Sequence, residues 1–233
     1  MPVSLLDWML YTAVFLFPAS IVSYLCGCFN GAVVVSKYIL KDDVREHGSG
    51  NAGLTNFYRT FGGVLTLVVI LCDVLKMVVA VGLVTLLIGN TVVARYWAGL
   101  FCLLGHMFPC MFGFRGGKGI LSGGTLAILI NWKVAVVVWG GFLLLVVLTK
   151  YVSLGSLWAG ASFPFASWHC YPQFPLAIVL AFITGGLVVW QHRSNVGRLL
   201  RGKENKFSFR HKGAEKKQEP PPEESGADGG KAA

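Results

Sequence analysis

Long apolar runs dominate this chain, and short polar segments interrupt them. The first run, from Trp8 to Ser36, contains no charged side chain. It exceeds the roughly 20 residues that a helix needs to cross a bilayer. Later apolar runs, two of which contain isolated charged residues, are 61–88, 96–114, 120–148, 151–168 and 174–190. The pattern predicts an all-α integral membrane protein, because a helix satisfies its own backbone groups inside a bilayer.

One apolar run, from Ile120 to Leu148, decides the number of spans, because Asn131, Trp132 and Lys133 interrupt it. If the chain breaks there, the first helix has about 12 residues and a length of roughly 18 Å, short of a 30 Å hydrocarbon core. We predict this break, because a short helix places the glycine-rich segment before it below the membrane surface, lining a wet cavity. The chain then has seven transmembrane helices, some of them short.

Positive charge is distributed unevenly between the two sides of this seven-helix arrangement. Of the 20 Lys and Arg residues, all but Arg95, Lys133 and the intramembrane Lys76 fall on one side. Cytoplasmic loops carry the excess of Lys and Arg in membrane proteins, so this side is the cytoplasm. We expect polar re-entrant or interfacial loops on the cytoplasmic face, with the amino terminus outside and the carboxyl terminus inside.

Composition agrees with a membrane protein, since hydrophobic residues make up 55% of the chain and charged residues 13%. The net charge of +9 comes from loops and the tail, where orientation and anionic lipid explain it, so we expect no nucleic-acid partner. We expect residues 1–206 to form a single seven-helix membrane domain. Residues 207–233 are basic and polar and rich in Pro, Glu, Gly and Lys, which predicts a disordered cytoplasmic tail.

Two sets of side chains inside the spans serve either chemistry or packing. Asp73 and Lys76 are three residues apart near the middle of the second span, which favours a structural ion pair over a direct substrate contact. Cys102, His106 and Cys110 share a helical face at four-residue spacing. They lack a fourth ligand, so we predict packing there and no metal site.

The polar segment between the first two spans includes GSGNAGLTN, in which three glycines accompany hydroxyl and amide side chains. This composition makes a poor helix and a good source of hydrogen-bond donors, so we predict an ordered loop. Its candidate substrate-binding residues are Asn51, Thr55, Asn56 and Arg59. The alternative is a flexible connector.

A second polar segment, FRGGKG, directly precedes the fourth apolar run. It places the cations Arg115 and Lys118 among Gly116, Gly117 and Gly119, whose missing Cβ atoms let consecutive backbone N–H groups form an anion-binding nest. The first turn of the following helix adds free N–H groups and the positive end of its dipole. The segment therefore predicts a phosphate site formed by all five residues. The alternative is a charged turn that only sets orientation.

A third polar segment, HRSNVGRL, follows the last span. His192 and Asn195 are three residues apart and share a face if the last helix continues. Arg193 adds a cation that could bind phosphate. A basic juxtamembrane segment would explain the arginine but neither the imidazole nor the amide, so both interpretations stay open for this segment alone.

Together, three cationic segments on one membrane face indicate a site for phosphorylated substrates. The patterns GSGNxGxTNxxR, GHxFPxxFxFRGGKG and HRxNxxRLxxGxE occur in this order. In these patterns the chain resembles the bacterial acyl-phosphate:glycerol-3-phosphate acyltransferases, integral enzymes of the inner membrane, over nearly its whole length to about Lys206.

That resemblance implies transfer of a fatty acyl group from acyl phosphate to the 1-hydroxyl of sn-glycerol 3-phosphate. The products are lysophosphatidic acid and phosphate, in the first acylation of phospholipid biosynthesis at the cytoplasmic face. It implies no cofactor, no metal and no acyl-CoA, and we expect a monomer in contact with membrane lipid. It assigns Ser49, His192 and Asn195 to catalysis and Glu204 to a structural role.

Charge and reactivity agree with this reaction. Each substrate carries close to two negative charges, so Arg59, Lys118 and neighbouring cations must offset their repulsion. Acyl phosphate is already activated, so positioning and charge stabilisation suffice, and we expect direct attack by the glycerol hydroxyl. Either His192 or a donor phosphate oxygen accepts the proton. The alternative function, a transporter or channel for phosphorylated solutes, is disfavoured because the polar motifs lie on one face without an inverted repeat.

Overall fold

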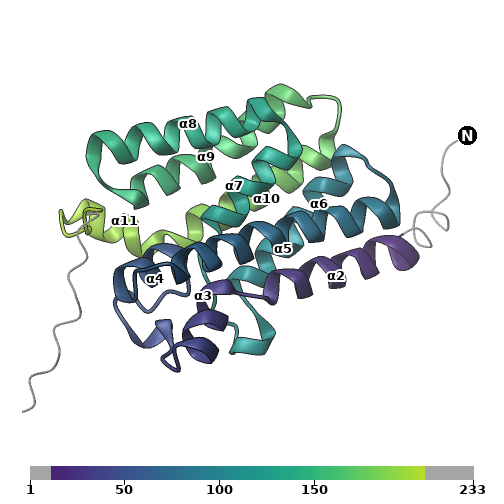
Figure 1. Cartoon of the computed structure of the whole chain (residues 1–233). Helices are drawn as coiled ribbons and strands as arrows, with labels where there is room; N and C mark the ends of the chain where they lie inside the picture. The colour runs from purple at the N-terminus through teal and green to yellow at the C-terminus, as the bar shows by residue number, and fades with distance from the viewer. Residues whose placement is uncertain (1–11, 208–233) are drawn as a thin grey trace, which may run out of the picture.

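The computed structural model describes residues 12–207, and the regular elements in that range are all helices, without strands (Figure 1). The elements are η1 Thr12–Leu16, α2 Phe17–Cys28, α3 Gly31–Val34, η2 Val35–Ile39, η3 Val44–Glu46, α4 Leu54–Thr60, α5 Leu65–Ile88, α6 Val92–Met107, η4 Cys110–Phe112, α7 Ile120–Ile130, α8 Trp132–Thr149, α9 Val152–Cys170, α10 Pro175–Gln191 and α11 Arg193–Leu200. The predictions for the start of the first span, the amino terminus and the tail beyond Phe207 lie outside the described residues.

The first span is bent, which corrects the expectation of one continuous helix as far as Ser36. α2 ends at Cys28, and the helix axis turns by 42° before the chain continues through α3 and η2. Asn30 stabilises the new direction, because its side chain accepts a hydrogen bond from the Val33 N–H at 3.2 Å and so caps α3. Its amide also donates to the Ala52 carbonyl at 3.1 Å, which ties the bend to the first polar loop.

The predicted break between α7 and α8 is confirmed. α7 ends at Ile130 and α8 begins at Trp132. Between them Asn131 is extended, and its side chain accepts a hydrogen bond from the Lys133 N–H at 2.9 Å. With 11 residues α7 is one of the short apolar helices, with a length of roughly 16 Å.

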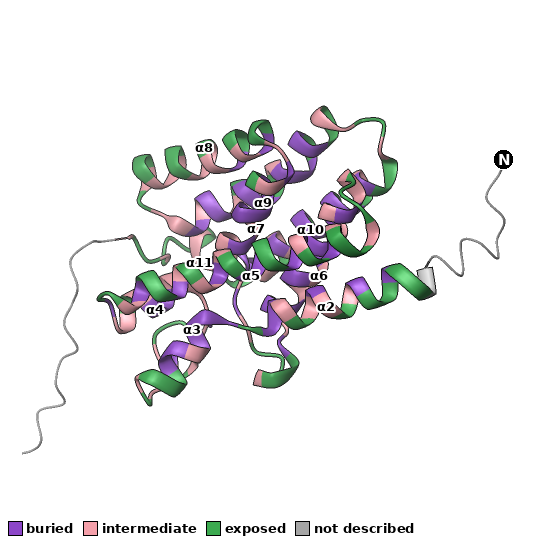
Figure 2. Cartoon of the chain, turned by 45° about the vertical axis from the view of Figure 1, so that its right-hand side comes forward, coloured by how far each residue is buried: buried purple, intermediate pink, exposed green. Residues whose placement is uncertain are grey.

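Close helix packing depends on glycines where α2 crosses α6. A Cβ on Gly27 would collide with the Cys102 carbonyl, and one on Gly105 would collide with the Tyr24 carbonyl. On the other side of the bundle α9 packs between α8 and α10. Little of α8 is buried (Figure 2), and apolar side chains there suit contact with lipid.

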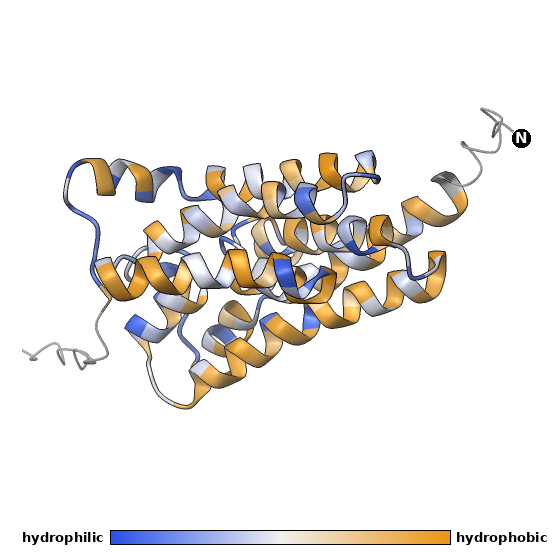
Figure 3. Ribbon diagram, turned by 90° about the horizontal axis from the view of Figure 1, so that it is seen from above, coloured by the Kyte–Doolittle hydropathy of each residue, from blue (hydrophilic) through white to orange (hydrophobic). Residues whose placement is uncertain are grey.

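Within residues 12–207 two helices, α5 and α8, are long and apolar enough to cross a membrane by themselves, and two bent pairs raise this number to four. The pairs are residues 14–39 and residues 175–200, the second bent by 52°. Hydrophobic residues colour most of the helical surface, whereas hydrophilic residues concentrate in the connecting segments (Figure 3). The count of seven spans and the orientation stay predictions.

The two ends of the bundle carry different polar groups. α4 and α11 lie at one end (Figure 1). At the opposite end the Nη1 of Arg95 donates to the Leu129 carbonyl at 3.2 Å, and the Tyr171 hydroxyl donates to the Ile130 carbonyl at 3.1 Å. These bonds satisfy carbonyls that the end of α7 leaves without helical partners.

Candidate active site

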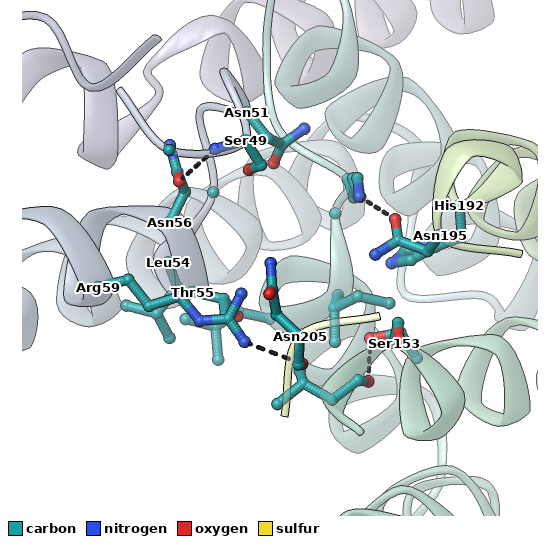
Figure 4. A pocket seen from close by; sticks show the side chains of 18 of the residues that line it. Ser49, Asn51, Leu54, Thr55, Asn56, Arg59, Ser153, His192, Asn195 and Asn205 are labelled. Carbon is teal, nitrogen blue, oxygen red and sulfur yellow. Dashed lines mark hydrogen bonds between the residues drawn. The ribbon is translucent and has the colours of Figure 1, made fainter. Parts of the chain in front are cut away.

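A cavity of about 630 Å³ lies where the three predicted polar segments meet (Figure 4). The predicted site residues that line it are Ser49, Asn51, Thr55, Asn56 and Arg59 from the first segment, Lys118 and Gly119 from the second, and His192, Asn195 and Glu204 from the third. Asp73 of α5 lines it as well. The convergence expected from the sequence is therefore present in the fold.

Asn56 gives the first loop its shape. Both N–H groups of its amide are used, one on the Val44 carbonyl and one on the His47 carbonyl, each at 3.0 Å. Its oxygen accepts the backbone N–H of Ser49 at 3.0 Å. The sequence predicted that the Asn56 amide would bind a phosphate. Because these groups are all bonded to the loop backbone, Asn56 instead holds Ser49 at the cavity wall.

Arg45 fastens this first loop to the next polar segment, although no sequence pattern distinguishes it from the other charged residues around it. Its Nη2 pairs with the Asp43 carboxylate at 2.7 Å, and its Nη1 donates to the Phe112 carbonyl at 2.7 Å. Hydrogen bonding from Arg45 lowers the pKa of the Asp43 carboxyl despite partial burial. The pair is therefore a clamp between two loops that lie far apart in the sequence.

The glycine loop packs on the end of α6, which corrects the expected nest of free N–H groups. The Gly116 N–H donates to the Met107 carbonyl and the Gly117 N–H to the His106 carbonyl, both at 3.1 Å. A Cβ at Gly116 would collide with the His106 carbonyl, and one at Gly117 would collide with the His106 ring. These two glycines thus permit a close approach of backbones, and their N–H groups are already occupied.

Lys118 begins a chain of polar contacts that runs through the third segment. Its Nζ donates to the Asn195 Oδ1, the Asn195 amide donates to Glu204 at 2.9 Å, and the Arg198 Nε donates to Glu204 at 2.7 Å. Burial and repulsion from Arg198 lower the pKa of Lys118 to about 8, although Glu204 acts in the opposite direction. Arg198 also lines the cavity, although it was not among the residues predicted for the site.

His192 is buried, with 3% of its surface exposed, at the junction of α10 and α11. Its Nδ1 lies 2.8 Å from the Val188 carbonyl. A carbonyl only accepts, so Nδ1 carries the proton and Nε2 of the neutral ring is an acceptor. That is the tautomer a general base requires.

Two arginines that were expected to bind phosphate, Arg115 and Arg193, do not line the cavity. Arg115 is exposed. The Arg193 guanidinium lies 4.2 Å from the centre of the Trp190 ring and donates to the Trp190 carbonyl at 3.2 Å. Stacking on an aromatic ring satisfies this cation at the surface, which a sequence pattern does not reveal.

The segment after α11 supplies a wall of the cavity that sequence reasoning did not assign. Asn205 lines the cavity, and its carbonyl accepts a hydrogen bond from Arg59 Nη2 at 3.4 Å. Two residues later the Phe207 N–H donates to the Lys150 carbonyl at 2.7 Å. Residues 203–207 therefore cross from α11 to the α8–α9 connection beside α4.

Inside the bundle the predicted ion pair is confirmed, because Lys76 Nζ lies 2.6 Å from Asp73 Oδ1. The expected helical face of Cys102, His106 and Cys110 is wrong at its last member, since α6 ends at Met107 and Cys110 belongs to η4. Among residues 12–207 no cluster of three or more His, Cys, Asp or Glu is arranged to hold a metal ion.

Comparison with known proteins decides the family. The family model described as glycerol-3-phosphate acyltransferase matches residues 17–202. The chain belongs to this family. A glycerol-3-phosphate acyltransferase of Thermoanaerobacter pseudethanolicus is 38% identical over 191 residues, which cover 81% of this chain and 93% of the relative. The acyltransferase of Shouchella clausii is 40% identical over 192 residues, which cover 81% of this chain and 94% of the relative.

Solved structures of an acyltransferase of this family share the fold. The crystal structure of PlsY (YgiH), an integral membrane glycerol 3-phosphate acyltransferase, in its glycerol 3-phosphate form has a TM-score of 0.73 and 31% identity. The match covers 83% of this chain and 96% of PlsY. Its lysophosphatidic acid form has a TM-score of 0.71 at the same identity. The helical bundle is therefore that of an integral membrane acyltransferase.

Proposed function

We propose that this protein transfers a fatty acyl group from acyl phosphate to the 1-hydroxyl of glycerol 3-phosphate. The products are lysophosphatidic acid and inorganic phosphate. The observation that carries this function is the single cavity at which the three family patterns converge. The glycerol 3-phosphate and lysophosphatidic acid forms of PlsY support the acceptor and the product.

Cations at the cavity bind the two phosphate groups. Lys118, supported by Arg198, holds the phosphate of glycerol 3-phosphate, and Arg59, which lines the same cavity (Figure 4), holds the phosphate of the donor. Asn51 and Thr55 line the same cavity and add hydrogen-bond partners. Two dianions repel each other at this range, so these cations are needed for both substrates to bind together.

The chemical step is direct attack by the glycerol 1-hydroxyl on the acyl carbonyl carbon. A new C–O bond forms, the bond from the acyl carbon to the phosphate oxygen breaks, and phosphate leaves. His192 Nε2 takes the hydroxyl proton, or a donor phosphate oxygen does. Asn195 and Ser49 hydrogen-bond the reacting groups and stabilise the developing charge. Glu204 orients Asn195 through the 2.9 Å bond.

The membrane arrangement that fits this function has seven spans in one domain over residues 1–206. The amino terminus is outside, and the cavity opens to the cytoplasm of a bacterial inner membrane. Support comes from the Lys and Arg in the segments that form the cavity, while Arg95 and Lys133 lie beside the opposite end of α7. The protein acts as a monomer without a cofactor.

Purified full-length protein in lipid discs, supplied with acyl phosphate and glycerol 3-phosphate, tests the reaction. We expect equal amounts of phosphate and lysophosphatidic acid. Acyl-CoA and acyl carrier protein serve as comparison donors and should give no product. Equal turnover with acyl-CoA would contradict the proposed donor, and uptake of glycerol 3-phosphate into sealed vesicles without acylation would favour a transporter.

A further inference from the structure

A buried polar network lies against the cavity and has so far only a structural role. It consists of Asp73 and Lys76 on α5 and His106 on α6, and it is called the ion network below. Each of the three residues is at most 5% exposed. Burying charge in an apolar interior is costly even when the charges are paired. The position of this network therefore needs an explanation beyond packing.

Lys76 is the centre of the network. Its Nζ donates to Asp73 Oδ1 at 2.6 Å, to His106 Nδ1 at 2.6 Å and to the Phe29 carbonyl at 3.3 Å. An ammonium has three N–H donors and no acceptor. Its three N–H groups therefore bond to acceptors on three segments, namely α5, α6 and the bend after α2. The Lys76 ammonium thus links these three segments.

The ring of His106 contacts Lys76 on one side and the glycine loop on the other. Because Lys76 only donates, His106 Nδ1 accepts, and the neutral ring carries its proton on Nε2. Nε2 lies against Gly117, where an added Cβ would collide with it. The His106 carbonyl also accepts the Gly117 N–H at 3.1 Å. His106 therefore fixes Gly117 through both its ring and its backbone.

Asp73 fixes the chain on the other side of Lys118. Its backbone carbonyl accepts a hydrogen bond from the Ser122 hydroxyl at 3.2 Å, in the first turn of α7. Between these two attachments lie Lys118 and Gly119, and Gly119 has a φ of +78°, which glycine adopts without strain. The loop that carries Lys118 is thus held on one side by His106 of the network and on the other side by a backbone carbonyl of α5, the helix that carries Asp73 and Lys76.

We infer that the ion network positions Lys118 for glycerol 3-phosphate. Asp73, Lys76 and His106 are positioning residues in this account, although Asp73 and His106 line the cavity. A carboxylate repels a phosphate, and the carboxylate of Asp73 is already paired with Lys76, which favours positioning over substrate contact. The inference rests on the proposed function, because it takes Lys118 as the ligand of that substrate.

The double variant Asp73→Asn with Lys76→Met tests the inference, because it removes both charges and leaves neither one unpaired in the interior. The full-length protein in lipid discs is assayed for kcat and KM, for inhibition by inorganic phosphate and for its thermal unfolding midpoint. We expect KM for glycerol 3-phosphate and Ki for inorganic phosphate to rise together by about tenfold, the size of one lost charge-assisted contact. KM for acyl phosphate should change less than about threefold, since its cation Arg59 is on another segment.

His106→Asn provides a second test that keeps the ion pair. Its Oδ1 retains an acceptor for Lys76, while the N–H that faces Gly117 is lost. We expect KM for glycerol 3-phosphate to rise by about threefold to tenfold, while KM for acyl phosphate changes less. A folded His106→Asn protein with wild-type KM for glycerol 3-phosphate would overturn the inference, even if the double variant fails to fold. Lys133→Met, at the far end, is the matched control and should leave every constant unchanged.

Lys118→Ala separates this inference from the proposed function. If Lys118→Ala leaves KM for glycerol 3-phosphate unchanged, the proposed phosphate site is wrong, and the inference about how Lys118 is positioned fails with it. If Lys118→Ala raises KM while both network variants keep the wild-type value, the phosphate site stands and the ion network has only a packing role.

Discussion

Cations occupy both ends of this bundle, but they are used differently. At the far end Arg95 donates to Asn90 Oδ1 at 3.0 Å and 2.8 Å and to the Leu129 carbonyl. At the cavity end Lys118 and Arg59 each make one hydrogen bond within the described part of the chain. A cation whose N–H groups are all bonded to the protein stabilises a helix end, whereas a cation with unbonded N–H groups can bind an anion. Side-chain partners, more than residue type, distinguish the two ends.

The largest effect should come from His192→Ala at the cavity end. We expect kcat to fall by about 10²-fold to 10⁴-fold, the usual contribution of a general base, with KM for glycerol 3-phosphate nearly unchanged. Steady-state assays of phosphate release measure both constants. His169→Ala is the matched control, since His169 is exposed near the far end of α9. Retained turnover in His192→Ala would assign proton transfer to the donor phosphate.

Lys118→Ala should give the next largest effect, because it removes the cation that faces the acceptor phosphate. The loss of a charge-assisted hydrogen bond, about 1.5 to 3 kcal/mol, corresponds to a rise in KM for glycerol 3-phosphate of roughly tenfold to a hundredfold. Isothermal titration with glycerol 3-phosphate checks the same change as a binding constant. Lys133→Ala removes a cation at the far end and should change neither value; a change there would mean that net charge, not position, sets the affinity.

Lys118 should also make substrate binding depend on pH. Its pKa is lowered to about 8, so the ammonium is charged below that pH and loses its charge as the pH rises. At pH 9 about one-tenth of it is charged, and KM for glycerol 3-phosphate should rise by up to about tenfold. Lys118→Arg stays charged throughout this range. Its KM should therefore lack this rise, and an identical alkaline profile would assign the titration to another group.

At the far end Arg95→Ala should affect stability and leave catalysis intact. The change leaves carbonyls at the end of α7 without this donor, at a cost of about 1 to 3 kcal/mol. We expect a lower thermal unfolding midpoint in lipid discs and wild-type kcat at temperatures below it. A loss of kcat in the folded variant would mean that the far end communicates with the cavity.

The smallest effect should come from Arg193→Ala, although the residue is next to His192. Its guanidinium stacks on Trp190 and does not line the cavity. We expect less than about a twofold change in KM for either substrate, as for other surface substitutions. Arg198→Ala is the informative comparison, because Arg198 lines the cavity; its KM for glycerol 3-phosphate should rise clearly above that of Arg193→Ala.

Local patterns predicted the break between α7 and α8, where a run of three interrupting residues coincides with a helix cap. Asn131 interrupts an apolar run and caps α8, so the break there could be foreseen. The bend after α2 could not, because Asn30 stands in an otherwise apolar stretch. Its effect depends on the Ala52 carbonyl, 22 residues away in the sequence. Tertiary contacts of this kind leave no periodic signal.

The same distinction applies to the site. Charge and motif order predicted which segments converge, and resemblance to a family supplied the expected roles. The hydrogen-bond and stacking partners of individual side chains and N–H groups could not be predicted. The Gly116 and Gly117 N–H groups are consumed by α6, and the Arg193 guanidinium by Trp190. Each of these choices depends on the arrangement of the folded chain, which composition alone does not determine.

The cavity wall formed by residues 203–207 affects how the protein matures. A ribosome delivers the chain from its amino end, so Glu204 and Asn205 emerge after every helix of the bundle has been synthesised. Until then Asn195 and Arg198 lack their carboxylate partner. Nascent protein is thus expected to be inactive even when its spans are inserted, and expression tags are best fused beyond Phe207, where they leave this wall in place.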